Sequence, residues 1–380
     1  MTENPHQPKE YDAVLGNQNS LLVNAAVLGG IGQVKQRLTD PDIEVRVAAL
    51  KDAIKYGEAG LDLIIKSLED EASKVKFAAY SLLKHRTETK VEQQLDKFFP
   101  FFDFDVITVN EFGQEISRYC QKARYFIEDL GNGVFLEMVS IPGGTFLMGS
   151  HDTEKKRNRD EGLQHQVTVP SFFMGKYQVT QAQWQAVAAL PQINISLDAN
   201  PSDWKSANLH IDNVSWNDAR EFCIRLSVKT GKTYRLPREA EWEYACRAGT
   251  TTPFYFGETI TTDLVNYNGN YTYASEPKVI ERKRTDVGSF PPNAFGLYDM
   301  HGNIREWCAD IWHGYDYDYT SSESVRQSGG IHQYRMSRGG SYNSKPENCR
   351  SASRLLFDPR FVDYLCYFGF RVVCGATWTL

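Results

Sequence analysis

The sequence predicts an α+β protein: a small all-helical part followed by a larger part with little regular secondary structure. Two observations lead to this prediction. An apolar pattern that begins at Val45 recurs at Val75, 30 residues later, and repeats of this length are typical of stacked helix pairs. From Phe135 onward, glycines, aromatic residues and short alternating runs dominate, which is typical of short strands joined by loops.

The repeat in the N-terminal part resembles HEAT-type helical repeats. Val45–Leu50 and Val75–Tyr80 each carry a pair of alanines that lets helices approach closely, and Pro41 and Gly60 punctuate the units. We therefore predict a HEAT-like domain over residues 19–98. Because about three repeats are usually needed for independent stability, we expect it to pack against a neighbour or a second copy.

The remaining boundaries follow from composition. Residues 1–18 are polar and contain proline, which predicts a disordered tail. Residues 99–133 are predicted to be a connector with a helical piece around Ile116–Leu130. The second domain is predicted to span residues 134–380.

Local signals place several elements in the second domain. His165–Val169 alternates between apolar and polar residues, as a half-buried strand does. Thr180–Gln183 reads as a capping box that opens a helix, and Ser215 or Asn217 opens a second. Pro237 is predicted to start a third helix.

Composition excludes several classes of function. The chain has 380 residues, a formal net charge of −6, 20 Tyr and 21 Phe, which argues against a nonspecific nucleic-acid binder and a polybasic membrane binder. The longest apolar stretch, Leu21–Ile31, is too short to cross a bilayer, and the N-terminus lacks the apolar region of a signal peptide. We expect a cytoplasmic protein. The seven cysteines contain no Cys-x-x-Cys pair, so a zinc ribbon or thioredoxin motif is not expected.

The run Leu355–Phe368 stands out near the C-terminus. It contains no Lys, Glu, Gln, Met or Trp. Replacing both adenines of an AAC or AAT codon at random leaves C or T in the third position, and those five residue types then cannot be encoded. A buried core strand is the alternative reading, but Asp358–Arg360 and Asp363 would interrupt such a strand. We therefore expect an exposed, aromatic-rich surface.

An ordered series of motifs runs through the second domain: Ile141–Ser150, Val214–Trp216, Arg235–Tyr244, Gly296–Asn303, Arg338–Ser341 and Gly369–Arg371. This series resembles the formylglycine-generating-enzyme (sulfatase-modifying factor) domain. The resemblance covers roughly Phe135–Ala376 and implies a C-type-lectin-like fold. It departs from the pattern at Ile304-Arg305, where an aromatic residue usually precedes Glu306-Trp307.

The resemblance implies that an oxidase of this family would hold copper with two cysteines after the Arg-Gly-Gly-Ser strand. Here Tyr342–Asn348 contains no cysteine, and Cys349 alone follows. A copper(I) dithiolate needs two sulfur ligands. Cys366 matches no family position. An iron-binding branch needs clustered His and Glu, whereas the N-terminal region offers only His6 and His85. We predict no catalytic residues.

A second resemblance is to the variable proteins of diversity-generating retroelements, in which an error-prone reverse transcriptase rewrites adenines in a C-terminal cassette. It implies a lectin-type scaffold that displays a diversified ligand-binding surface, here over about residues 342–368. Tyr364, Tyr367, Phe361 and Phe368 are the expected anchors, because aromatic rings offer large contact areas. The candidate ligand-binding residues are Tyr342, Asn343, Ser344, Ser353, Leu355, Leu356, Phe357, Asp358, Arg360, Phe361, Val362, Asp363, Tyr364, Leu365, Cys366, Tyr367 and Phe368.

The first resemblance also implies a calcium site around Asp299–Glu306. Carried over, the carboxylates of Asp299 and Glu306 and the backbone carbonyls of Gly302 and Ile304 would be the ligands, and hard oxygens suit calcium. The alternative is that these groups hydrogen-bond loop backbone.

Taken together, the residues and the resemblances predict a non-enzymatic, bacterial, cytoplasmic ligand-binding protein. Its ligand is expected to be a protein, bound at the C-terminal surface, with no nucleic acid, membrane or required cofactor. The helical repeats are expected to bind a further protein partner. Two alternatives stay open: a formylglycine-generating oxidase that acts on a sulfatase cysteine, and a signalling adaptor that binds through the helical repeats.

Overall fold

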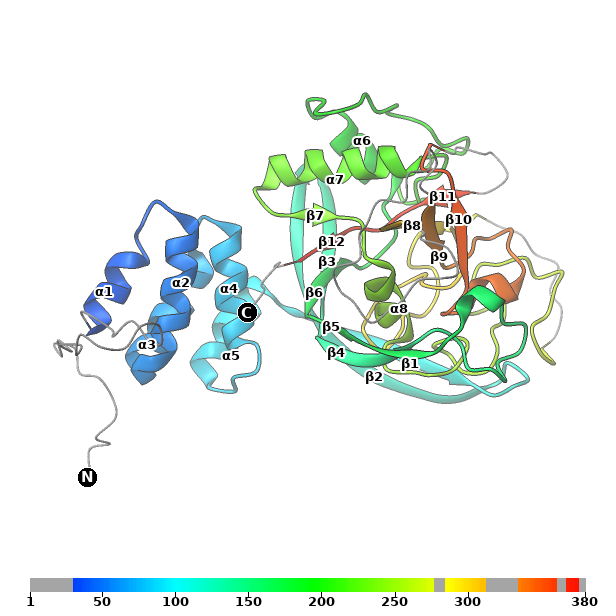
Figure 1. Cartoon of the computed structure of the whole chain (residues 1–380), viewed down its shortest axis with the longest axis horizontal. Helices are drawn as coiled ribbons and strands as arrows, with labels where there is room; N and C mark the ends of the chain where they lie inside the picture. The colour runs from blue at the N-terminus through cyan, green and yellow to red at the C-terminus, as the bar shows by residue number, and fades with distance from the viewer. Residues whose placement is uncertain (1–29, 277–283, 312–333, 361–366, 376–380) are drawn as a thin grey trace. The chain divides into compact units, whose positions relative to one another are not determined.

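The computed structural model describes residues 30–276, 284–311, 334–360 and 367–375. The chain divides into a helical unit within residues 1–100 and a larger unit within residues 101–375 (Figure 1). The predicted disordered tail lies outside the described residues. No helix in the described ranges is both long and apolar enough to cross a membrane.

The helical unit is held together by the apolar faces that the repeat predicted. Ala49 and Leu50 of the first repeat and Ala79 and Tyr80 of the second are all buried. Asp42 caps the helix of the first repeat, α2, which begins at Ile43, by accepting a hydrogen bond from the Glu44 backbone N–H. The helices among the described residues are α1 (Gly30–Arg37), α2 (Ile43–Ala53), α3 (Gly57–Lys66), α4 (Ser73–Leu83) and α5 (Thr89–Phe98).

Ion pairs link the two repeats, and one of them is largely buried. Arg46 Nε on α2 lies 3.2 Å from Asp70 Oδ2 in the next repeat, and both side chains are largely buried. Arg46 also donates to the Asp40 carbonyl, so its guanidinium joins the turn before α2 to the turn before α4. The two repeats recognised in the sequence are therefore also in contact with each other in the structure.

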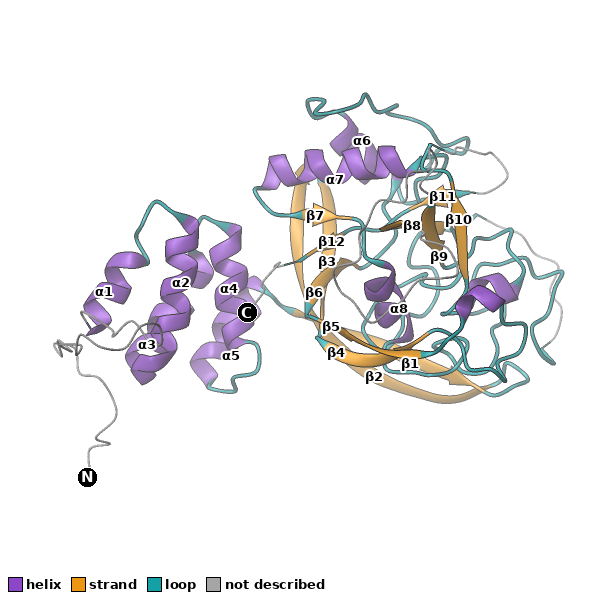
Figure 2. Cartoon of the chain, viewed as in Figure 1, coloured by secondary structure: helices purple, strands orange, loops and turns teal. Residues whose placement is uncertain are grey.

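The larger unit is built on three antiparallel or mixed sheets with long loops between them (Figure 2). A six-stranded sheet has the order β1-β2-β3-β6-β12-β7, a four-stranded sheet the order β10-β9-β8-β11, and β4 pairs with β5. The strands are β1 (Phe101–Val109), β2 (Glu115–Gly131), β3 (Val134–Ile141), β4 (Gly144–Met148), β5 (His165–Val169), β6 (Phe172–Gly175), β7 (Tyr234–Arg235), β8 (Arg305–Ile311), β9 (Arg335–Arg338), β10 (Arg354–Phe357), β11 (Phe368–Gly369) and β12 (Val373–Cys374).

The predicted helix around Ile116–Leu130 is wrong. This segment is β2, which pairs with β1 in one half and β3 in the other. Phe126, Glu128 and Leu130 are buried at alternate positions, which is the period of a strand. The segment is therefore a structural part of the larger unit, and the prediction of a connector there does not describe it.

Three helices pack on the sheets of the larger unit: α6 (Gln181–Ala188), α7 (Trp216–Thr230) and α8 (Glu239–Arg247). Thr180 caps α6 through the predicted capping box. Of the two residues predicted to open α7, Ser215 is the N-cap, and it too forms a capping box. The third helix begins at Glu239, two residues after the predicted start. On the inner side of α6 and α7, the rings of Trp184 and Phe222 stack 5.7 Å apart.

The C-terminal strands fix the position of the candidate surface. β10 pairs antiparallel with β9, so that Phe357 lies opposite Arg335. β11 pairs parallel with β8, with Phe368 opposite Arg305. Residues before and after the run of interest are therefore anchored in the same four-stranded sheet.

Candidate binding surface

A tight turn after β9 presents the first candidate residues. Gly339 and Gly340 have φ values of +88° and +74°, which residues with a side chain rarely adopt. A Cβ on Gly340 would lie 2.5 Å from Cys349 Sγ, so a residue with a side chain would also clash at this position. After the turn, the Tyr342 backbone N–H donates to the Asn303 carbonyl, which holds Tyr342 at the edge of the sheet.

Aromatic rings from three separate segments surround one arginine at this edge. The rings of Tyr342 and Tyr367 lie 4.7 Å apart, centroid to centroid. The Arg284 guanidinium lies 5.3 Å from the Tyr342 ring, 5.7 Å from the Tyr367 ring and 5.2 Å from the Trp204 ring. Trp204 is 62% exposed. We call these four residues the aromatic cluster.

Arg284 is fixed within the aromatic cluster by two polar contacts. It donates to the Tyr342 hydroxyl and to the buried Asp212 carboxylate, each at 3.2 Å. Burial is the main reason that the pKa of Asp212 is raised. Trp204 and Arg284 were missed by the sequence analysis, since neither lies near the run Leu355–Phe368 in the sequence and only tertiary packing brings them to Tyr342 and Tyr367.

The segment after Arg354 forms the second part of the candidate surface. Leu355, Leu356 and Phe357 of β10 are half-buried, so each leaves part of its side chain accessible. Asp358 and the exposed Arg360 form an ion pair of 2.8 Å. The main chain here is held by a hydrogen bond from the Asn217 N–H of α7 to the Pro359 carbonyl.

Three predicted ligand-binding residues are buried, which corrects the prediction for them. Ser353 and Phe368 are each 2% exposed and Ser344 is 8% exposed. The Phe368 ring stacks on Trp307 at 4.3 Å, so it is a core residue and not an anchor for a ligand. Ser344 Oγ accepts hydrogen bonds from the Ser341 backbone N–H and from Arg305, which explains its burial.

The remaining predicted residues divide into two groups. Tyr342, Asn343 and Tyr367 are half-buried at the surface. Phe361, Val362, Asp363, Tyr364, Leu365 and Cys366 lie outside the described residues, so their roles stay predictions.

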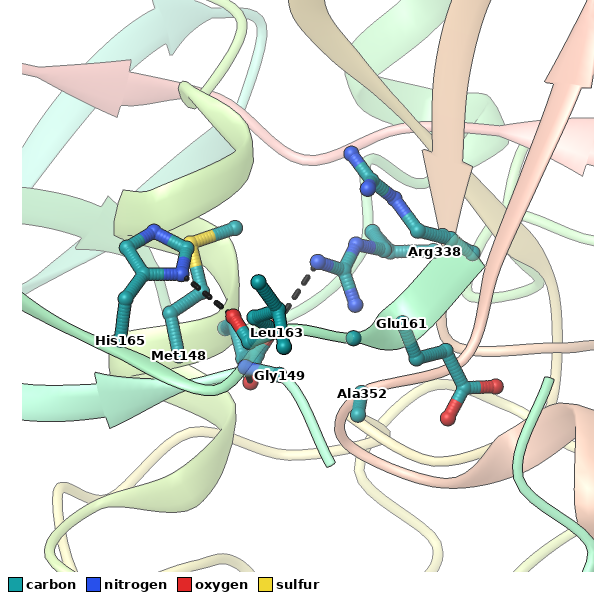
Figure 3. A pocket seen from close by; sticks show the side chains of 10 residues that line it. Met148, Gly149, Glu161, Leu163, His165, Arg338 and Ala352 are labelled. Carbon is teal, nitrogen blue, oxygen red and sulfur yellow. Dashed lines mark hydrogen bonds and ion pairs between the residues drawn. The ribbon is translucent and has the colours of Figure 1, made fainter. Parts of the chain in front are cut away.

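A small pocket elsewhere in the unit offers little room for a ligand (Figure 3). Its free volume is about 20 Å³, enough for roughly one water molecule. Glu243 and Arg338 in its wall are fully paired with each other and with neighbours. His165 Nδ1 is bonded to the Leu163 carbonyl at 2.9 Å. The pocket is therefore a packing defect among buried ion pairs.

Comparison with known proteins identifies the family. Residues 131–376 match the family described as the sulfatase-modifying factor enzyme 1-like domain. The chain belongs to this family. The fold of this sulfatase-modifying factor domain agrees with the α+β class predicted from the sequence.

Three of the similar proteins illustrate the match. Serine/threonine-protein kinase pkn1 of Chlamydia caviae is 32% identical over 283 residues, which cover 69% of this chain but 41% of the kinase. The structure of PvdO from Pseudomonas aeruginosa is 32% identical, has a TM-score of 0.55, and the match covers 66% of this chain and 97% of PvdO. Treponema denticola variable protein 1 is 24% identical with a TM-score of 0.50, covering 66% of this chain and 98% of that one, and this likeness shows the shared fold.

The oxidase chemistry implied for this family lacks support in its cysteines. Cys349 is fully buried, and its Sγ lies 3.7 Å from the Lys345 carbonyl. Burial raises the pKa of the Cys349 thiol to about 12, which keeps it protonated at neutral pH. Since a thiolate is the reactive form of cysteine, this thiol is a weak nucleophile while no metal is bound to it. Cys366, the other cysteine considered, is not among the described residues.

The predicted calcium ligands are already occupied by a side-chain amide. Gln178 Nε2 lies 2.9 Å from Glu306 Oε1, 3.1 Å from the Ile304 carbonyl and 3.4 Å from the Gly302 carbonyl. The Asp299 carboxylate accepts a hydrogen bond from the Gly288 backbone N–H. A hydrogen-bond donor therefore contacts the oxygens that a cation would need, and the residues do not fit calcium.

The pH dependence of stability at Asp299 tests the conclusion that these residues do not bind calcium. Burial raises the pKa of Asp299 from 3.8 to about 6, so the folded state binds more protons than the unfolded state between these values. The free energy of unfolding therefore falls as pH rises through this window, by about 2–3 kcal/mol. Asp299→Asn should remove this fall and raise stability at pH 7. Asn also tolerates the φ of +57° at this position.

Urea denaturation between pH 4 and pH 7, with EDTA or with calcium chloride, measures the effect. Asp286→Asn, an exposed change in the same loop, should leave the slope unaltered. If Asp299→Asn destabilises the protein only when calcium is present, Asp299 is a calcium ligand after all.

Proposed function

We propose that the chain is a non-enzymatic protein-binding protein whose C-terminal surface contacts the partner. The observation that carries the proposal is the aromatic cluster: Tyr342, Tyr367 and Trp204 come from three distant segments and meet at an accessible edge around Arg284. Large aromatic rings and arginine are the residues most enriched among the energetically dominant residues of protein interfaces. The half-buried side chains of Leu355–Phe357 extend this surface.

The scaffold favours binding over catalysis. Ser344, which stands in the segment where the resemblance places the copper cysteines, is buried and hydrogen-bonded. The aromatic cluster rests on the sheet through backbone bonds of Tyr342 and Tyr367 to residues 303 and 305, so its rings are held in place before a partner arrives. Preorganised rings lose little conformational freedom on binding, which increases affinity.

We further propose that the surface is diversified by adenine mutagenesis, as the restricted composition of Leu355–Phe368 predicts. Diversified positions must tolerate many side chains without unfolding the scaffold. Exposed Arg360 and half-buried Tyr367 meet this requirement, whereas Phe368 does not. The neighbouring DNA tests the proposal: we expect an adenine-rich copy of the cassette beside a reverse-transcriptase gene.

The helical unit is proposed to be a HEAT-like repeat that couples the binding domain to a second protein in the bacterial cytoplasm. Its Arg46–Asp70 pair joins successive repeats, as expected for a stacked array. Deleting residues 19–98 should leave capture by the aromatic cluster intact. Loss of all capture on this deletion would favour the adaptor alternative.

Alanine substitution tests the main proposal. Tyr342→Ala with Tyr367→Ala should abolish enrichment of the partner from lysates of the source cells, since two rings that could each contribute about 2 kcal/mol are removed. Val228→Ala, an exposed apolar change on α7 (68% exposed), is the matched control and should retain the partner. If the parent protein, the double tyrosine variant and Val228→Ala all enrich the same protein, the proposal is contradicted.

A further inference from the structure

Arg335, at the start of β9, lies at the edge of the candidate surface, and none of the residues that the structure describes forms an ion pair with it. Its guanidinium carbon lies 3.8 Å from the centroid of the Trp216 ring, and Nη1 donates to the Ala309 carbonyl at 2.9 Å. Nε is buried and has no hydrogen-bond acceptor within the described ranges. In register, Arg335 is opposite Phe357 of the candidate surface.

A second unpaired arginine shares the same tryptophan. The Arg220 guanidinium, exposed on α7, lies 5.9 Å from the Trp216 ring centroid. Burial, with the neighbouring charge of Arg220, lowers the pKa of Arg335. The nearest acidic influence on Arg335 is Asp310, whose carboxylate accepts a hydrogen bond from the Glu239 backbone N–H.

This arrangement contrasts with the other inward-facing arginines of the unit. Arg338, Arg350 and Arg371 are each ion-paired with one or two glutamates. No ion pair joins Arg335 or Arg220 to a carboxylate in the part of the chain that the structure describes. The like charges of Arg335 and Arg220 repel each other, and a bound anion would offset that repulsion.

The arginine pair is continuous with the surface proposed to bind the partner. Arg220 lies in the first turns of α7, and the N–H of Asn217 in the same turn donates to the Pro359 carbonyl. The guanidinium of Arg335 stacks on Trp216 with one face. Its Nε is buried and its Nη1 donates to the Ala309 carbonyl, which leaves Nη2 for a ligand.

We propose that Arg335 and Arg220, supported by Trp216, bind a carboxylate from an acidic segment of the protein partner. The inference rests on the proposed function and adds the chemistry of the partner. Guanidinium groups bind carboxylates through paired, charge-assisted hydrogen bonds.

A labelled peptide can test the arginine pair without the natural partner. The probe is a fluorescein-labelled peptide with four glutamates separated by glycines, and the reference peptide carries glutamines instead. Fluorescence anisotropy with the full chain should show binding of the glutamate peptide at least 10-fold tighter than the reference. Arg335→Gln and Arg220→Gln should each weaken binding about 10-fold. Lys229→Gln, which removes the same charge at the far end of α7, should not.

Arg335→Lys separates charge from geometry. It keeps the positive charge but loses the planar fork, so we expect partial recovery relative to Arg335→Gln. Equal affinity of Arg335→Gln, Arg220→Gln and Lys229→Gln for the glutamate peptide would overturn the inference. So would tighter binding of a single-stranded oligonucleotide than of the peptide.

The two proposals fail in distinguishable ways. If the partner is captured through Tyr342 and Tyr367 but Arg335→Gln leaves capture unchanged, the proposed function stands and the carboxylate site is wrong. If the peptide result holds but no partner depends on the two tyrosines, the site stands and the proposed function is wrong.

Discussion

Replacing Phe368 by alanine should lower the free energy of unfolding by about 3–5 kcal/mol. The ring is 2% exposed and lies 4.3 Å from Trp307 and 4.6 Å from Phe357, so its removal opens a cavity in the core. The neighbouring change Tyr367→Ala should lower stability by about 1 kcal/mol or less, because that side chain is only half-buried. Urea denaturation of the two variants measures the difference.

These two variants test whether, of two adjacent residues, Phe368 belongs to the core and Tyr367 to the binding surface. If Phe368→Ala proves as stable as the parent protein, the ring is not a core residue and the boundary drawn here is misplaced. If Tyr367→Ala is as damaging as Phe368→Ala, the aromatic cluster is structural and a role in binding loses its physical basis.

Replacing Glu306 by glutamine should cost about 3–5 kcal/mol of stability, since it leaves a buried arginine without its counterion. Glu306 and Arg371 are both fully buried, and their ion pair is 2.8 Å long. The carboxylate also accepts hydrogen bonds from the Trp242 indole and the Gln178 amide. All its acceptor positions therefore serve neighbouring donors.

The matched control for Glu306 is Glu115→Gln in the exposed pair with Arg118 on β2. Exposed pairs contribute about 1 kcal/mol or less, so this change should be nearly silent in the same denaturation experiment. Similar losses for the two variants would mean that burial does not set the strength of these pairs, contrary to the explanation given for the Glu306–Arg371 pair.

Local signals in the sequence predicted the local structure well. Thr180 and Ser215 cap helices because their side chains satisfy backbone N–H groups close by, which requires no tertiary information. The α+β class and the helical unit followed from periodicity. The helix prediction for Ile116–Leu130 failed because the first half of this strand is exposed on both faces. Burial alternates from residue to residue, as is typical of a strand, only from Phe126 onward.

The candidate site was only partly predictable, for a physical reason. The composition of Leu355–Phe368 singled out this run as unusual. It could not show that Phe368, which pairs in β11, is buried in the core while Tyr367 stays half-buried at the surface. Trp204 and Arg284 join Tyr342 only through packing between distant segments. The Gln178 amide donates hydrogen bonds to the oxygens that were expected to coordinate calcium, and the sequence around Gln178 carries no local sign of that role.

Photo-crosslinking from position 367 tests the central claim most directly. With benzoylphenylalanine in place of Tyr367, irradiation in the source cells should give one discrete adduct with the partner protein. The same group at Val228, on the exposed side of α7, should give none. Adducts that are equally abundant from positions 367 and 228, or absent from both, would contradict the account that this surface is the binding face.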